Sequence, residues 1–271
     1  MNNFYNEIKA YLDKINTNIL FVHTDISKGF KVEFNGVKNE YISAHIELLL
    51  NMHSDLYLPV FNYDFSKSKV FDVINDISQV GVMNEFFRKK YANWQTPIPF
   101  YSIAGTGAIP EYKFTENIHV FDENSIWGHL YKNNSAIMYY GAAFSSSTIL
   151  HFVEKISNKL CYRYEKQFKG EVILSKDQVI KINLNMHVRP MNYYLDYDWI
   201  KIENDLYKNK ILVQFKEGLT DIKIVNVKNL VDFWLSKIYE DKLYFLDKKS
   251  LSWVSPMLNK LKRPFEQFDF E

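Results

Sequence analysis

The sequence contains a single cysteine and no long apolar run. The one thiol, that of Cys161, cannot form an internal disulfide or supply a thiolate-rich zinc site. This usage fits a reducing compartment, so we expect a cytoplasmic protein in which Cys161 is buried packing. The longest apolar runs, such as residues 19–22, are far shorter than the roughly 18 residues that a membrane span needs. The opening segment, MNNFYNEIKAYLDKI, mixes charged side chains into its apolar positions, unlike a secretory signal.

The sequence also has almost no excess charge. Lys and Arg number 33 against 32 for Asp and Glu, so no strong field points to a nucleic-acid backbone or an anionic membrane. We expect a small-molecule partner and no nucleic acid, and we leave a homodimer open. The histidines form neither an H-E-x-x-H motif nor a Cys/His cluster, so we predict no metal site.

The sequence does contain a regular alternation of helical and strand-like segments. Apolar residues recur at helical spacing in 4–15, 42–52, 80–90 and 125–131, and short apolar runs at 19–23, 56–61 and 136–141 predict strands. Such alternation predicts an α/β fold, with a central mostly parallel sheet flanked by helices on both faces. Ligands of such folds usually bind beyond the carboxyl ends of the strands.

Three parts are expected along the chain. Residues 1–160 form the α/β core that carries the functional site. Residues 161–227 contain short strand-like runs between polar turns, which predict a small antiparallel β-rich insertion. Residues 228–271 return to helical spacing and are expected to complete the core.

The segment GAAFSSSTILHFVE, residues 141–154, is the most informative part of the sequence. A buried strand ends in small residues, and hydroxyl side chains from Ser145 to Thr148 are suited to cap the helix that follows. His151 would then lie in the first turn, where the positive end of the helix favours a neutral imidazole. Glu154 is three residues on, and its carboxylate can orient that ring. The alternative is that His151 only packs on the sheet and that Glu154 is solvated.

Several segments, in order, resemble the aminoglycoside 3-N-acetyltransferase family, which also contains sugar N-acyltransferases. ILFVHTDISKG at 19–29 resembles the family's VHSSLS-type loop, with Thr24 and Asp25 in place of the two serines. The strongest match is Thr148 to Glu154, which resembles its T-x-L-H-x-x-E order. Further matches are LYLPVF at 56–61, the G-x-x-x-E-x-x-R pattern at 81–88, and IPFYSIAG at 98–105, which lacks the two histidines of the family's HPxHSxAxxG-type segment.

The resemblance implies an acyl-CoA-binding and catalytic core in residues 1–160, with acetyl-CoA or another short-chain acyl-CoA as co-substrate. His151 would be the general base for direct transfer to an amine, and Glu154 would orient it. The candidate coenzyme A contacts are Thr24, Ser27, Lys28, Gly29, Ser102 and Thr148. The candidate acceptor contacts are Asp64, Tyr101 and, from the aromatic run NYYLDYDW at 192–199, Tyr194 and Asp196, although an aromatic β-hairpin explains that run equally well.

The expected acceptor is a nucleotide-linked amino sugar used for surface polysaccharide. The alternatives are an aminoglycoside, as in antibiotic resistance, and a noncatalytic protein that binds coenzyme A or a sugar. An aminoglycoside carries several ammonium groups and needs several carboxylates, whereas a sugar diphosphate needs cationic or N–H donors. The balanced charge of the chain and Lys28 beside the predicted loop favour the nucleotide sugar.

Overall fold

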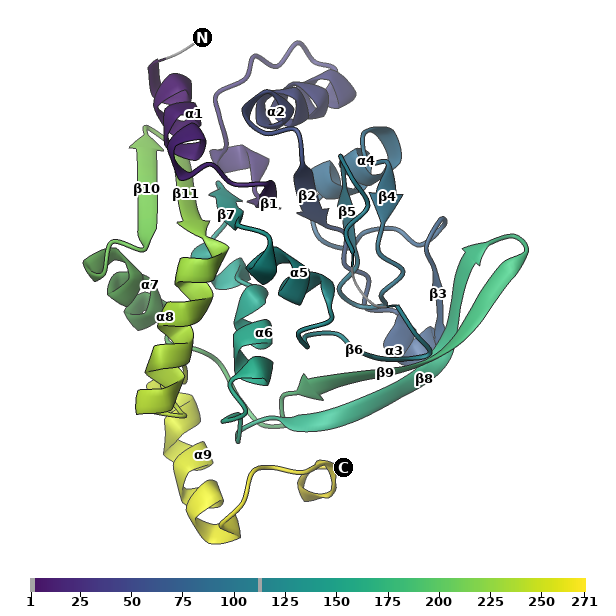
Figure 1. Cartoon of the computed structure of the whole chain (residues 1–271), viewed down its shortest axis with the longest axis vertical. Helices are drawn as coiled ribbons and strands as arrows, with labels where there is room; N and C mark the ends of the chain where they lie inside the picture. The colour runs from purple at the N-terminus through teal and green to yellow at the C-terminus, as the bar shows by residue number, and fades with distance from the viewer. Residues whose placement is uncertain (1–2, 112–113) are drawn as a thin grey trace.

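A computed structural model describes residues 3–111 and 114–271 (Figure 1). Over these residues the main sheet has seven strands, in the order β10-β11-β7-β1-β2-β5-β4. Their bounds are Leu212–Glu217, Thr220–Asn226, Ser135–Tyr140, Ile19–Thr24, Leu56–Pro59, Ile103–Gly105 and Trp94–Gln95, respectively. Strands β7, β1 and β2 run parallel, and antiparallel strands extend the sheet at both edges. The predicted α/β class is confirmed, with parallel pairing in this sheet confined to its centre.

Helices cover both faces of the main sheet, because side chains alternate between the faces along each strand. On β1, Leu20 and Val22 pack with helices α1 (Asn3–Ile15), α2 (Lys38–Met52) and α4 (Val82–Lys90). Phe21 points to the other face, with helices α5 (Ile126–Lys132), α6 (Ile149–Ile156) and α8 (Val227–Glu240). The two-sided burial explains why β1 begins with four consecutive apolar residues and why every residue of β7 is buried.

A second, smaller sheet lies beside the main one, in the order β3-β8-β9-β6. Strands β8 (Tyr164–Ser175) and β9 (Gln178–Val188) form a long hairpin that curves away from the main sheet in Figure 1. The hairpin is flanked by β3 (Val70–Asp72) and β6 (Asn117–His119), both from the first half of the chain. Strands β10 and β11 instead join the main sheet, because β11 pairs with β7 along its edge. The strands expected in one insertion are therefore divided between two sheets.

The remaining elements connect these layers. They are η1 (Ile26–Lys28), α3 (Phe65–Ser68), η2 (Phe144–Ser146), α7 (Trp199–Lys208), α9 (Lys248–Leu261) and η3 (Gln267–Asp269). The aromatic run at 192–199 is a loop leading into α7, whose N-cap is Asp198, so the alternative of a β-hairpin there is wrong. Within the described residues, no helix combines the length and the apolar content that crossing a bilayer would need.

Candidate active site

A cleft of about 440 Å³ lies at the carboxyl ends of the three parallel strands. Its walls come from the end of β1 (His23 and Thr24), the end of β2 (Pro59), and the residues between β7 and α6. Tyr101 and His151 complete one side of it. The cleft thus lies where the sequence pattern placed a ligand site. None of its described lining residues is Asp, Glu, Lys or Arg.

The segment between β7 and α6 is turned toward the first loop by Gly141. This glycine has φ of +72°, and a Cβ at this position would lie 2.2 Å from the backbone oxygen of Asp25. Only a glycine allows both the left-handed backbone and that close approach. Helix α6 then starts at Ile149 with Thr148 as its N-cap, but no side chain caps it. The predicted hydroxyl cap is wrong, since the Ser147 hydroxyl donates to the carbonyl of Phe144 and also bonds the Tyr139 hydroxyl.

His151 lies in the first turn of α6, as predicted, and its side chain is 20% exposed. Its Nδ1 lies 2.9 Å from Oε2 of Glu154. An ionised carboxylate only accepts hydrogen bonds, so Nδ1 carries the proton and Nε2 keeps its lone pair. Burial lowers the pKa of His151, and the charge of Arg163 lowers it further, against the opposing effect of Glu154. The resting ring is therefore neutral and able to accept a proton.

Glu154 is a buried carboxylate at the centre of a hydrogen-bond cluster. Its side chain is 1% exposed, and its Oε1 accepts from the hydroxyls of Tyr162 at 2.7 Å and Tyr197 at 2.6 Å. Besides the imidazole described above, Oε2 contacts Nε2 of His187 at 3.2 Å and Nε of Arg163 at 3.4 Å. Burial alone would raise the pKa of Glu154, but Arg163 and the two imidazoles outweigh it and hold this pKa well below the usual range. The predicted contact between positions 151 and 154 is confirmed, and the alternative of a solvated Glu154 is wrong.

Four members of this cluster were not found from the sequence: Tyr162, Arg163, His187 and Tyr197. They come from the region expected to be a separate insertion, so the cluster is not confined to residues 1–160. Arg163 also donates to the Tyr197 hydroxyl, from Nε at 3.0 Å and from Nη2 at 2.6 Å. Arg163 and Tyr197 are 34 positions apart, so their contact leaves no local pattern in the sequence. The one available signal was the aromatic run at 192–199, which contains Tyr197.

The structure places the candidate coenzyme A contacts in different locations. Thr24 and Thr148 line the cleft. Ser27 and Gly29 line a different cavity, of about 790 Å³, and Lys28 between them is exposed. Ser102 requires a correction, because its side chain is fully buried and its hydroxyl donates to the carbonyl of Thr96 at 2.6 Å. That hydroxyl stabilises the neighbouring loop and does not reach the cleft.

Asn84, which the sequence reading missed, connects two of these segments. Its side-chain oxygen accepts from the Thr24 hydroxyl at 2.5 Å, and its nitrogen donates to the carbonyl of Pro59 at 2.7 Å.

Glu85 and Arg88, from the family-like pattern at 81–88, form a bidentate ion pair with distances of 2.8 and 2.9 Å. Arg88 also donates to the carbonyl of Ile74 at 3.1 Å, so this pair holds the loop that follows β3.

Of the candidate acceptor contacts, Tyr101 alone lies on the cleft. Asp64 is exposed and accepts from a glutamine side chain, and Tyr194 is exposed and donates to a carboxylate at the start of α9. One carboxylate oxygen of Asp196 accepts from the next backbone N–H, and its backbone pairs with the start of α9. These three side chains do not meet at the cleft, whereas Tyr197 and Trp199 from the same run do line it.

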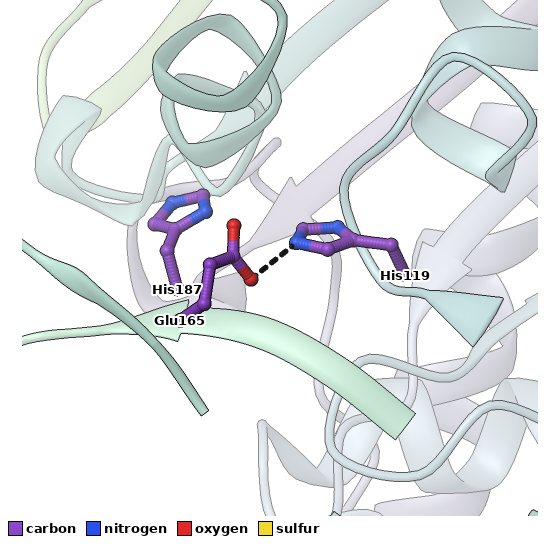
Figure 2. A group of neighbouring side chains, drawn as sticks. All are labelled: His119, Glu165 and His187. Carbon is purple, nitrogen blue, oxygen red and sulfur yellow. Dashed lines mark hydrogen bonds and ion pairs between the residues drawn. The ribbon is translucent and has the colours of Figure 1, made fainter. Parts of the chain in front are cut away.

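Figure 2 shows a second group beside this cluster, with the Glu165 carboxylate between His119 and His187. One ligand atom of each residue lies within 4.8 Å of the others, a spacing that could hold a metal ion. However, Nδ1 of His119 accepts from the backbone N–H of Phe121 at 3.1 Å, so its Nε2 carries the hydrogen that meets Glu165 at 3.1 Å. That tautomer offers no lone pair to a cation at this point. The hydrogen bond between His119 and Glu165 therefore joins β6 to β8.

Together, the fold and the site define an α/β protein with a hydrogen-bonded histidine–carboxylate pair at the carboxyl ends of parallel strands. The aminoglycoside 3-N-acetyltransferase family model matches residues 59–238, and the chain belongs to this family. The resemblance expected from the sequence is thereby confirmed. No curated protein sequence matches the chain significantly.

Solved structures of similar fold agree with this assignment. The aminoglycoside acetyltransferase AAC(3)-IVa apoenzyme is 15% identical, with a TM-score of 0.64 and coverage of 90% of this chain and 91% of that one. YokD from Bacillus subtilis is also 15% identical, with a TM-score of 0.64 and coverage of 88% and 94%. The binary complex of AAC-IIIb with CoASH has 15% identity, a TM-score of 0.69 and coverage of 87% and 96%. At such identities the likeness concerns the fold.

Proposed function

We propose that this protein transfers a short acyl group from coenzyme A to the amine of an amino sugar, with His151 as general base. One observation carries the proposal: a buried, ionised Glu154 fixes Nδ1 of His151 and leaves Nε2 without a partner among the described residues. A neutral ring held in this way, on the wall of a cleft, is suited to remove a proton from an incoming nucleophile. The same arrangement has no evident use in a protein that only binds ligands.

The proposed reaction needs one proton acceptor and no covalent acyl-enzyme. The neutral amine attacks the thioester carbonyl, a C–N bond forms, and Nε2 of His151 accepts the proton that the nitrogen loses. The tetrahedral intermediate then releases the thiolate as the C–S bond breaks, and the imidazolium returns the proton to sulfur. Glu154 stays ionised and stabilises the transient imidazolium. Hydroxyl and N–H groups of the segment between β7 and α6 are the candidates for stabilising the oxyanion.

Coenzyme A is the proposed acyl donor. Among the described residues, those that line the cleft carry no charged side chain, and they present hydroxyl and amide groups, including those of Thr24, Asn84 and Thr148. Such a surface suits the amide-containing pantetheine arm. AAC-IIIb, a protein of similar fold, was solved as a complex with CoASH, which supports this assignment. Ser27, Lys28 and Gly29 remain proposed contacts for a more distant part of the donor, and a cytoplasmic location remains a prediction.

Two acceptor classes are supported by different observations. The name of the family, and structures of similar fold solved with gentamicin, apramycin and sisomicin, favour an aminoglycoside. The lack of Asp and Glu among the described lining residues of the cleft disfavours several ammonium groups, and this supports the nucleotide-linked amino sugar expected from the sequence. A role of that sugar in surface polysaccharide remains part of this proposal.

Replacement of His151 by Asn tests the proposal. We expect kcat/KM for N-acetylation to fall roughly 100- to 10,000-fold, since this is the usual contribution of a general base. Calorimetric binding of coenzyme A should change less than about threefold, because the base does not hold the donor. His53→Asn, at the opposite end of β2, is the control and should retain activity. Near-normal turnover of His151→Asn would reject the assignment, and a panel of nucleotide amino sugars and aminoglycosides would rank the acceptors.

A further inference from the structure

Two more cavities adjoin the cleft, and all three share the side chain of Tyr101. The first, which we call the arginine cavity, has a volume of about 310 Å³ and lies between His151, Arg163 and Arg189. The second, the lysine cavity, has a volume of about 610 Å³ and lies along the second sheet, between Phe100, Phe168 and the lysines nearby. His151 thus has the neutral cleft on one side and the arginine cavity on the other.

Most of the charged residues that line these two cavities are basic. The described lining of the arginine cavity includes two arginines and no carboxylate. The lysine cavity has three basic residues, Lys69, Lys166 and Lys169, against one carboxylate, Glu271. The charged side chains that line the space beyond His151 are therefore mostly basic, although the whole chain is nearly neutral. A substrate carrying several ammonium groups would be repelled from it.

Not all of these cations are free to meet a ligand. Arg163 is committed to Glu154 and Tyr197, and Lys166 forms an ion pair with Glu271 at 2.5 Å. Arg189 differs, because it is exposed, follows the end of β9, and has no ion pair within residues 3–111 and 114–271. Its charge acts on Tyr101, where it opposes the effect of burial that raises the pKa of this phenol. Arg189 therefore lines the arginine cavity with a charge that acts on Tyr101, the residue that the three cavities share.

We propose that Arg189, supported by Lys69 and Lys169, forms an anion subsite for a phosphate or diphosphate group of the acceptor, whose amine lies at His151. This inference rests on the proposed function and adds the charge class of the acceptor. A guanidinium offers paired N–H donors that match phosphate oxygens. The acceptor is favoured over the donor as the source of the anion, because the arginine cavity touches the base itself. The phosphates of coenzyme A are separated from its thioester by the whole pantetheine arm and cannot lie beside the base with the reacting carbon.

Binding measurements test the subsite without requiring turnover. With saturating coenzyme A, we expect glucosamine 6-phosphate to bind at least tenfold more tightly than glucosamine, with the difference shrinking as salt rises. Arg189→Gln should remove most of this difference and change the Kd of coenzyme A less than about threefold. Lys176→Gln, in the exposed turn of the β8–β9 hairpin, changes the net charge equally and should keep the difference.

The outcomes separate this inference from the proposed function. His151→Asn should retain the preference for the phosphorylated sugar while losing catalysis, so catalytic failure alone would not affect the subsite. Equal affinities for the two sugars would overturn the inference. So would tighter binding of gentamicin than of glucosamine 6-phosphate at the same ionic strength. An Arg189→Gln variant that loses affinity for coenzyme A and keeps the sugar preference would assign the cation to the donor and equally overturn the inference.

Discussion

Replacing Glu154 by Gln separates the structural role of the buried carboxylate from its proposed catalytic role. Glutamine has nearly the same shape, but it has one acceptor oxygen and an NH₂ group where glutamate has two acceptors. The tyrosine hydroxyls at Oε1 can rotate to accept from the new NH₂ group, whereas the Arg163 guanidinium at Oε2 can only donate. We therefore expect the amide oxygen to take the Oε2 position and to keep the contact with Nδ1 of His151.

The lost charge has two expected effects. First, Arg163 becomes a buried cation without a counter-charge, which costs about 3–5 kcal/mol of folding free energy. For a chain of this size that corresponds to a fall in Tm of roughly 6–20 °C. Second, Glu154 no longer raises the pKa of His151, while burial and Arg163 still lower it. The base becomes weaker, and we expect kcat to fall at least about 100-fold.

A pH–rate profile with a thermal melt checks both effects. A general base acts in its neutral form, so activity falls as pH drops through its pKa, and a lower pKa moves this acidic limb to lower pH. The double variant Glu154→Gln/Arg163→Met should recover most of the lost stability, because it removes the unpaired cation, without recovering the rate. A single variant with an unchanged acidic limb and kcat within threefold of the wild type would refute the role of Glu154.

Two further predictions concern stability. Burial lowers the pKa of His23 to about 3 and those of His45 and His187 to about 4, below the ordinary value of 6.5. As the pH falls, the unfolded chain therefore binds protons at these histidines before the folded chain does. The free energy of unfolding should decrease from about pH 6.5 to pH 4 by roughly 1.4 kcal/mol per pH unit for each histidine. A urea-denaturation profile that is flat over this range would contradict the lowered pKa values. Gly141→Ala should be destabilising by several kcal/mol, since the left-handed backbone costs about 1–2 kcal/mol and the backbone clash adds to it. Gly36→Ala, with a similar φ and nothing within 4 Å of its Cβ, should show the backbone cost alone, and equal losses in the two variants would rule out crowding at Gly141.

The local part of the fold was predictable from the sequence, and the pairing of its strands was not. Apolar spacing identified the helices now seen as α1, α2, α4 and α5, and the strands β1 and β7, because burial on one or two faces leaves a periodic pattern. The pattern missed α7 and did not show that β11 lies beside β7. It also could not show that β3 and β6 complete the second sheet, since such contacts join segments far apart in the chain.

The same distinction applies to the site. His151 and Glu154 were predictable together because helical spacing joins them within one turn. Ser102 was misassigned, because a family-like segment shows which residues are nearby and not which way a hydroxyl points. Arg163 and His187 were missed, because they reach Glu154 from the long hairpin and its approach, and nothing near them in the sequence marks that contact.

The arrangement around Glu154 explains how one buried carboxylate can support the proposed base without replacing it. Its pKa is held well below the usual range, so it does not take the proton from His151. Burial lowers the pKa of the His151 ring and Arg163 lowers it further, against the opposing effect of Glu154, so the resting imidazole is neutral. In the proposed reaction, the carboxylate therefore fixes the tautomer in the ground state and stabilises the imidazolium once the amine has given up its proton. Because both effects depend on the same buried carboxylate, the positions of its four other donors are expected to tune the strength of His151 as the proposed base.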